Sequence, residues 1–455
     1  MRFRTATVTS LFLIFGFALL GPLLVFWTAG YRWNPRNQRF EATGVVVIDT
    51  IPSSARIRIG ETESALVTPA RLTGVFPRDY TLTLSRDGYS SWQQTLTVNG
   101  GKTTFVDNVH LFPKQEPTLF FEKPVSKLAL SHDSSLLAAA VPTDGFTEIW
   151  MIEATNGTAN LEARLASSTI ETLDWSPSGT TLLVTERLAT GIRATLMQAG
   201  KKISLQTPAG ALTKIAWSQD DPTKLLGISR TTALGTIPEK NRLWIFPANG
   251  APPTPLENTE KETLGTLPLL SGGLLYGTQQ QSTTTRLYAA SPATGIQTDI
   301  AMLSGGPYEL LPSPEGFFTA HNSARAVIRI GEAQSVKPPA TIPAFSALWS
   351  PTAPWAALAW DDVELHVIEA NERVATLARV AEGVRSADWM TDASHALLLT
   401  AGDIRAIERS ERFGKHISTI LATFETTTAL ATSPTDTFVA GVRDGKAGIY
   451  RVALE

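Results

Sequence analysis

Short apolar runs alternate with turn residues over the last three quarters of the chain, and one recurring phrase marks their repetition. The clear copies are LDWSPSG at Leu173–Gly179, IAWSQDD at Ile215–Asp221, ALWSPTA at Ala347–Ala353, ADWMTDA at Ala387–Ala393 and LATSPTD at Leu430–Asp436, with weaker copies at Leu128–Ser134 and Leu310–Gly316. Each copy is followed by an apolar run, a turn and a second apolar run. A strand–turn–strand unit that recurs about every 40 residues is typical of a β-propeller.

The phrase divides the chain from about residue 117 to its end into eight units of three or four strands. The anchor residues of these units are Ser131, Ser176, Ser218, Ser271, Ser313, Ser350, Met390 and Ser433. The units near Ser271 and Ser313 are weak, so seven blades plus a degenerate one remain an alternative. Hairpin turns are expected at Asn156-Gly157, Asn249-Gly250 and Thr294-Gly295. The segment Pro117–Pro124 is expected to close the ring against the last strand.

The repeated phrase resembles the Trp-Ser-Pro-Asp-Gly turn of TolB-like and WD-type propellers. This resemblance covers residues 118–455 and concerns the turn and strand chemistry. It implies that the tryptophan packs between neighbouring sheets and that Ser-Pro begins a type I turn. The aromatic residues of the phrase are therefore expected to be structural core residues of the repeat: Trp175, Trp217, Trp349 and Trp389.

A second alternating apolar pattern, between residues 44 and 112, predicts a separate small β-sandwich. About five short antiparallel strands are expected, because apolar residues recur at every second position. The strands are predicted at Gly44–Pro52, Ala55–Gly60, Asp79–Tyr89, Trp92–Gly101 and Thr103–Leu111. Residues 113–117 hold two prolines and are expected to form a short stiff linker to the propeller at 118–455.

The turn residues of this segment resemble, in order and spacing, those of the PEGA domain. The matching motif consists of Pro52, Ala55, Thr68, Pro69, Gly88 and Tyr89, while Ser53-Ser54 replaces the Glu-Gly pair that names the family. The resemblance implies an extracytoplasmic structural or interaction module of the kind found in prokaryotic surface proteins. It implies no catalytic role.

The N-terminus carries an uncharged stretch from Thr5 to Tyr31, and Leu11–Trp27 is almost entirely apolar. About 20 apolar residues span the hydrocarbon core of a bilayer, so residues 11–29 are predicted to be a transmembrane signal-anchor helix. A cleaved signal peptide is the alternative. The prediction gives residues 1–10 as a short cytoplasmic N-terminus and residues 30–43 as a juxtamembrane linker. The protein is then a single-pass protein of the cell membrane with extracytoplasmic C-terminal domains.

Composition narrows the possible chemistry. The net charge of −3 gives no electrostatic case for nucleic-acid binding. The chain has no cysteine, which excludes disulfides, a thiolate nucleophile and cysteine-ligated metals. No catalytic, metal-binding or cofactor-binding motif is recognisable, and no cofactor is expected. An acidic cluster at Asp361, Asp362 and Glu364 is a candidate metal or acid–base site, with a solvated hairpin turn as the favoured interpretation.

Two functions follow from this organisation. The favoured one is a membrane-anchored binding or scaffolding protein of the prokaryotic cell envelope, in which the PEGA-like spacer presents a propeller that binds protein or glycan. The alternative is a hydrolase or lyase that acts on a surface polymer, because propeller active sites gather residues from several blades at the central channel. Carboxylates or histidines that converge in the channel would favour the enzyme.

Overall fold

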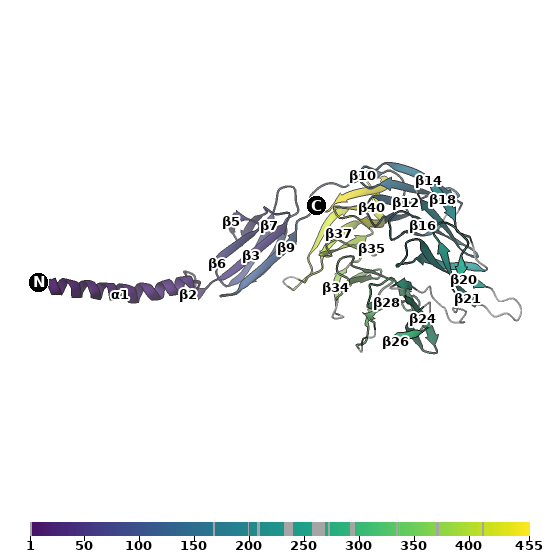
Figure 1. Ribbon diagram of the computed structural model, residues 1–455. Coiled ribbons are helices and arrows are strands. Elements are labelled where there is room, and N and C mark those ends of the chain that lie inside the picture. Colours follow the sequence, from purple (N-terminus) through teal and green to yellow (C-terminus); the bar gives the residue numbers. More distant parts are fainter. Residues whose placement is uncertain are drawn as a thin grey trace. The chain divides into compact units, whose positions relative to one another are not determined.

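The computed structural model describes residues 2–455 except 167–168, 199, 207–209, 232–239, 257–268, 272–273, 292–295, 334, 336, 370–372 and 412–413. The chain forms two compact units, Met1–Gln115 and Glu116–Leu454 (Figure 1). Each unit is described separately below.

The first unit begins with helix α1 (Arg2–Thr28), followed by a two-stranded ribbon of β1 (Tyr31–Asn34) and β2 (Arg39–Ala42). The helix covers the stretch for which a transmembrane span is predicted. In the part of the chain that the structure describes, no helix reaches the length and apolarity of a membrane span.

Seven strands in two sheets follow, rather than the five antiparallel strands expected. They are β3 (Gly44–Ile51), β4 (Arg56–Ile59), β5 (Thr62–Val67), β6 (Ala70–Val75), β7 (Arg78–Ser85), β8 (Trp92–Val98) and β9 (Thr103–His110). The sheet orders are β6-β3-β9 and β5-β4-β7-β8, and β3 runs parallel to β9. Strands β5 and β6 were missed because neither contains a fully buried residue.

The Thr68 side chain ties the PEGA-like motif together. Its buried hydroxyl accepts a hydrogen bond from the Ala55 amide at 2.9 Å and lies 2.5 Å from the Thr50 hydroxyl. Pro52, Ala55 and Thr68 therefore meet at one corner, since the Thr50 hydroxyl also bonds the Pro52 carbonyl. At a second turn, the Gly88 carbonyl accepts a bond from the amide of Lys114. There, Tyr89 also forms a bridge with Pro113. Pro69, which follows Thr68 at the first corner, is exposed.

In the residues that the structure describes, the second unit consists of eight four-stranded sheets, here called blades 1 to 8. Blade 1 contains β11 (Lys127–Leu130), β12 (Leu136–Thr143), β13 (Phe146–Glu153) and β14 (Ala159–Leu165), and blade 2 contains β15 (Ile170–Trp175), β16 (Leu182–Leu188), β17 (Gly191–Gln198) and β18 (Lys201–Ser204). Blade 3 contains β19 (Ala211–Trp217), β20 (Lys224–Thr231), β21 (Lys240–Pro247) and β22 (Thr254–Pro255), and blade 4 contains β23 (Leu269–Ser271), β24 (Leu274–Gln281), β25 (Thr284–Ala290) and β26 (Gln297–Ser304). Blade 5 contains β27 (Glu309–Leu311), β28 (Phe317–Asn322), β29 (Val327–Glu332) and β30 (Ala340–Pro343), and blade 6 contains β31 (Ser346–Trp349), β32 (Ala357–Trp360), β33 (Glu364–Ile368) and β34 (Val374–Arg379). Blade 7 contains β35 (Val384–Trp389), β36 (His395–Thr400), β37 (Asp403–Glu408) and β38 (Ser418–Thr423), and blade 8 contains β39 (Thr426–Thr432), β40 (Asp436–Arg443), β41 (Lys446–Ala453) and β10 (Thr118–Phe121).

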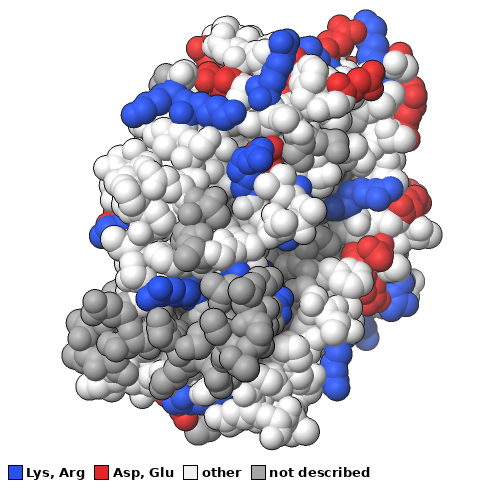
Figure 2. All heavy atoms as spheres, turned by 90° about the vertical axis from the view of Figure 1, so that its right-hand side faces the viewer, with Lys and Arg blue, Asp and Glu red and all other residues white. Residues whose placement is uncertain are grey.

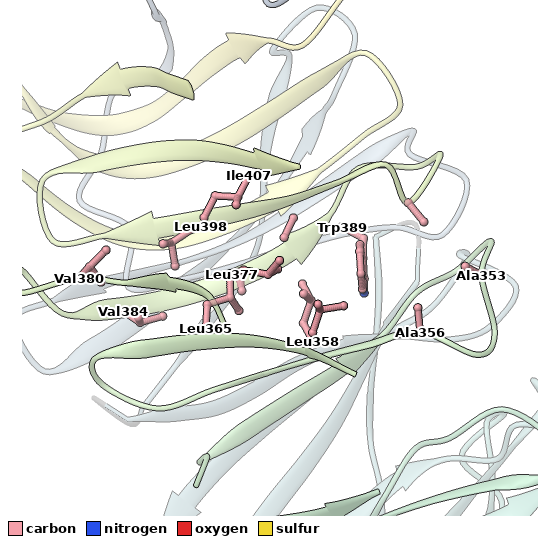
Figure 3. Packing of buried hydrophobic residues seen from close by; sticks show 14 residues of the cluster. Ala353, Ala356, Leu358, Leu365, Leu377, Val380, Val384, Trp389, Leu398 and Ile407 are labelled. Atoms are coloured by element: carbon pink, nitrogen blue, oxygen red, sulfur yellow. The ribbon is translucent and has the colours of Figure 1, made fainter. Parts of the chain in front are cut away.

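The eight blades form a closed ring. Every pair of consecutive blades shares a buried apolar cluster, and blade 8 shares one with blade 1 as well as one with blade 7. Figure 3 shows the cluster between blades 6 and 7, where Leu358 and Leu365 face Trp389 and Leu398. The count of eight resolves the alternative of seven. The weak units near Ser271 and Ser313 are genuine blades whose first strands have only three residues.

Strand β10 closes the ring, as the sequence predicts. It pairs antiparallel with β41, so the first and last strands of this unit share one sheet. Gly448 permits the close approach, because a Cβ there would lie 2.5 Å from the Phe121 carbonyl oxygen. Arg443 pairs with Glu116 just before β10. Of the three expected hairpin turns, Gly157 and Gly250 have φ of +79° and +82°. Thr294-Gly295 lies outside the described residues.

In several blades the serine of the repeated phrase organises its turn from inside. Ser131, Ser176 and Ser350 are all buried, and each hydroxyl accepts a hydrogen bond from a backbone amide further along the turn. In blade 2, the Ser176 amide also donates to the Thr181 carbonyl at 2.8 Å, which starts the second strand in register. The serine is therefore needed because its side chain satisfies a backbone donor that the turn leaves buried.

Candidate ligand-binding site

Three of the four repeat tryptophans connect neighbouring blades. The indole N–H of Trp175 donates to the Ala129 carbonyl, that of Trp217 to the Asp174 carbonyl and that of Trp389 to the Leu348 carbonyl. The three distances are 3.2, 3.0 and 3.2 Å. Each acceptor lies on the first strand of the preceding blade, at the position just before the one that matches the tryptophan. The structure thus places these side chains in the core between blades.

Trp349 differs from the other three. Its indole N–H donates to the Thr319 hydroxyl at 2.8 Å instead of a backbone carbonyl, and its ring is only half-buried. The ring of Phe317 lies beside it, with 5.2 Å between centroids. The first strand of blade 5 is short, and this leaves room for the two rings at the end of blades 5 and 6.

These rings form the floor of a crevice between blades 5 and 6. Its other lining residues include Ile330, Glu332, Trp355 and Glu369. Glu332, Trp355 and Glu369 lie at strand ends or in turns on the face that carries the repeated phrase. The crevice is narrow, with room for about one water molecule in its depth (≈ 20 Å³). A larger ligand would therefore lie across the mouth, against Trp355.

Trp355 stands at this mouth with 39% of its surface exposed. The Arg409 guanidinium of blade 7 lies over its ring, 4.9 Å from the centroid, and the Arg409 Nε lies 3.9 Å from a Glu369 carboxylate oxygen. The arginine fixes the ring through a cation–π contact and keeps a carboxylate beside it. An exposed, fixed aromatic ring flanked by hydrogen-bonding carboxylates is suited to binding a ligand that has both an apolar face and polar edges.

The first strands of consecutive blades contact one another, as β11 does with β15 and β39, and so surround the ring axis. Two aspartates on these strands occupy the same repeat position, directly before Trp175 and Trp389. Burial raises the pKa of the Asp174 carboxyl to about 6, with His132 lowering it in part. Burial also raises the pKa of Asp388 to about 6. By surface exposure, Asp174 is exposed and Asp388 is half-buried.

These aspartates belong to blades 2 and 7, which are separated in the ring by blades 1 and 8. Elsewhere, Lys214 of blade 3 forms an ion pair with Glu309 of blade 5. His321 pairs with Glu309 across β27 and β28. Burial lowers the pKa of His321, Glu309 raises it in part, and Lys214 lowers it further. The charged groups around the axis are thus distributed over several blades.

The acidic cluster at Asp361, Asp362 and Glu364 is a hairpin turn. The Asp361 carboxylate accepts hydrogen bonds from the amides of Val363 and Glu364, both at 2.7 Å, and Glu364 pairs with Arg379. Among the described residues, no group of three or more His, Cys, Asp or Glu side chains is arranged to hold a metal ion.

On the face shown in Figure 2, basic and acidic side chains are interspersed, and neither sign of charge dominates the surface. The crevice residues come from blades 5 and 6, and Arg409, which lies over Trp355, comes from blade 7, so no linear pattern marks the site. A second tryptophan six residues after Trp349, where other copies of the phrase have none, was the one signal in the sequence that could have pointed to the site.

The PEGA family model and the Dos1 propeller agree with this architecture. Residues 43–113 match the PEGA domain model, and this segment is a PEGA domain. The Dos1 propeller matches with a TM-score of 0.51 at 12% sequence identity, over 74% of this chain and 95% of that one. Sqt1 from Saccharomyces cerevisiae matches with a TM-score of 0.49 at 9% identity, over 74% of this chain and 97% of that one. No curated protein matches the sequence. The chain thus combines a PEGA domain with a β-propeller.

Proposed function

We propose that this protein is a membrane-anchored binding or scaffolding protein of the prokaryotic cell envelope. The PEGA domain acts as a spacer, and the propeller binds an envelope protein or glycan at the crevice beside Trp355. The single observation that supports binding most directly is this exposed ring, held by Arg409 and flanked by Glu369. No cofactor is required for this role.

Membrane attachment is part of the proposal and is supported by the surface of α1. Large apolar side chains project from it on all sides and are more than half exposed, among them Phe12, Phe15, Phe17 and Leu24. A helix that is apolar all round needs an apolar environment, since water would leave this surface unfavourably hydrated. The protein is then a single-pass protein, with its PEGA domain and propeller on the extracytoplasmic side.

Binding is tested with the full-length protein in detergent, immobilised and exposed to an envelope fraction of the cells that encode it. Trp355→Ala should reduce the retained material at least tenfold. Phe345→Ala is the matched control, because Phe345 is 47% exposed and precedes the other end of β31. Equal retention by the parent and Trp355→Ala would reject the crevice as the binding site.

The same experiment identifies the class of ligand. Periodate treatment of the envelope fraction oxidises vicinal diols of glycans, whereas protease treatment removes proteins. Loss of Trp355-dependent retention after periodate alone identifies a glycan, and loss after protease alone identifies a protein. If neither the parent nor the variants retain any envelope component, the binding function itself is wrong.

The alternative function, a hydrolase or lyase that acts on a surface polymer, draws on the two aspartates whose pKa is raised to about 6. A carboxyl group with such a pKa can act as a general acid near neutral pH. However, Asp174 is exposed, and no third carboxylate or histidine is grouped with these aspartates among the described residues. Release of reducing ends or unsaturated sugars from the envelope polymer, abolished by Asp174→Asn or Asp388→Asn, would support the enzyme over the binding protein.

A further inference from the structure

We infer that the β1–β2 ribbon is a lipid-binding element that inserts its aromatic side chains into the interfacial region of an anionic bilayer. This inference rests on the proposed membrane attachment of α1 and extends it to a folded element outside the helix. The occupant is the headgroup layer of the membrane, contacted by aromatic rings and by Arg32 and Arg36.

The ribbon is rigid for its size because one buried carboxylate organises its turn. Glu41, 8% exposed, accepts hydrogen bonds from the side-chain amides of Asn34 and Asn37, both at 2.7 Å, and from Arg39 at 2.6 Å. These bonds lower the pKa of Glu41 to about 2, with the Asn34 bond the largest cause. An isolated two-stranded ribbon is at best marginally stable in water. The buried network gives this one a defined shape.

This shape presents a continuous group of aromatic rings. Phe26 at the end of α1 lies 5.1 Å from Tyr31 and 6.4 Å from Phe40, measured between ring centroids, and Phe40 lies 5.3 Å from Trp33. Phe26, Trp33 and Phe40 remain about half exposed. Clustered aromatic rings of this exposure favour the membrane interface, where the ring is partly removed from water while polar edges stay hydrated.

The charge of the ribbon favours an anionic surface. Between Tyr31 and Ala42, three arginines stand against one glutamate, which gives a formal charge of +2. Glu41 and Arg39 neutralise each other inside the turn, so Arg32 and Arg36 carry the excess. The Arg32 guanidinium lies 3.7 Å from the centre of the Trp27 ring, at the end of the apolar helix. Basic residues at this level are attracted to acidic phospholipid headgroups.

The test uses the absence of cysteine from the chain, because a single introduced cysteine can carry a spin label without background. Full-length Phe40→Cys, Leu19→Cys and Gln93→Cys are labelled and reconstituted in phosphatidylcholine vesicles with or without phosphatidylglycerol. Power-saturation measurements with oxygen and a water-soluble nickel chelate give the depth of each label. Leu19 is exposed on α1, and Gln93 is an exposed control on β8 of the PEGA domain.

The expected depths are the acyl region for the Leu19 label, the interface for the Phe40 label and water for the Gln93 label. The Phe40 label should lie deeper when phosphatidylglycerol is present. Arg32→Gln together with Arg36→Gln should abolish this difference, whereas Arg71→Gln together with Arg78→Gln, two exposed arginines of the PEGA domain, should preserve it.

The outcomes separate this inference from the proposed function. A Phe40 label in water combined with a Leu19 label in lipid overturns the lipid-binding ribbon but leaves the anchor intact. A Leu19 label in water overturns the anchor itself. A Phe40 label shielded from both lipid-borne oxygen and the aqueous chelate indicates a protein partner, which also overturns the inference.

Discussion

The indole N–H of Trp217 donates a hydrogen bond to the backbone carbonyl of Asp174, 3.0 Å away in the preceding blade. Trp175 and Trp389 repeat this bond at equivalent positions. The recurring tryptophan therefore does two things at once: it fills the apolar space between two sheets and satisfies a main-chain acceptor of its neighbour.

Trp217→Phe is expected to lower the stability of the propeller by roughly 1–3 kcal/mol. Phenylalanine keeps most of the apolar surface but leaves the Asp174 carbonyl without its donor and creates a small cavity. Thermal unfolding followed by circular dichroism measures the loss. Trp355→Phe is the control, because that ring lies at the surface, and it should change the midpoint little. A midpoint unchanged in Trp217→Phe would show that the inter-blade bond contributes nothing to stability.

Ser54→Gly is expected to stabilise the PEGA domain by about 0.5–1 kcal/mol. Ser54 has φ of +68°, a left-handed conformation that is strained for any residue with a Cβ, and it occupies the place of the family's glycine. Ser53→Gly is a matched control, since the neighbouring serine is also exposed but has no such φ, and the added chain flexibility should be neutral or destabilising. Denaturant titrations of the full-length variants distinguish the two outcomes.

Gly448→Ala is expected to destabilise the closed ring by about 2 kcal/mol or more. The added methyl group would lie 2.5 Å from the Leu119 side chain and from the Phe121 carbonyl oxygen, so β10 must move away from β41. Gly402→Ala tests specificity, because its nearest neighbour would be 3.7 Å away. If both variants have the same melting temperature, the close packing of β10 against Gly448 does not contribute to the stability of the propeller.

Asp388→Asn is expected to stabilise the propeller at neutral pH but not in acid. The folded protein binds the Asp388 proton with a pKa of about 6, above the value of about 3.9 in an unfolded chain. Stability from this group is therefore fully present below pH 4 and is lost as pH rises toward 6. Asparagine removes that loss, by an amount on the order of 1 kcal/mol. Melting curves at pH 4 and 7.5 check this, with Asp392→Asn as a control for the change in charge.

Much of the fold could be predicted from sequence because its strongest signals are local. The repeated phrase marks the end of each first strand, and the apolar run before Pro124 revealed the closing strand. The weak blades were harder, since first strands of three residues leave almost no pattern. Strands β5 and β6 escaped prediction because they lie at sheet edges, where exposed residues are under little constraint to alternate.

The candidate site could not be predicted in the same way. Phe317, Trp355 and Arg409 come from three blades, and only ring geometry brings them together. The raised pKa of Asp174 and Asp388 likewise depends on the surrounding blades rather than on neighbouring residues in the chain. Sequence spacing carries no information about either arrangement, because both depend on contacts between strands far apart in the chain.

The position of β10 has a mechanical consequence. This strand is the first element after the PEGA domain, and it is also the strand that holds the ring shut against β41. If the propeller grips a ligand while its other end is tethered, any tension between the two is transmitted first into the β10–β41 ladder. Resistance to this load then depends on the four residues of β10, Thr118–Phe121, and on the ion pair of Glu116 with Arg443 that precedes them in the chain.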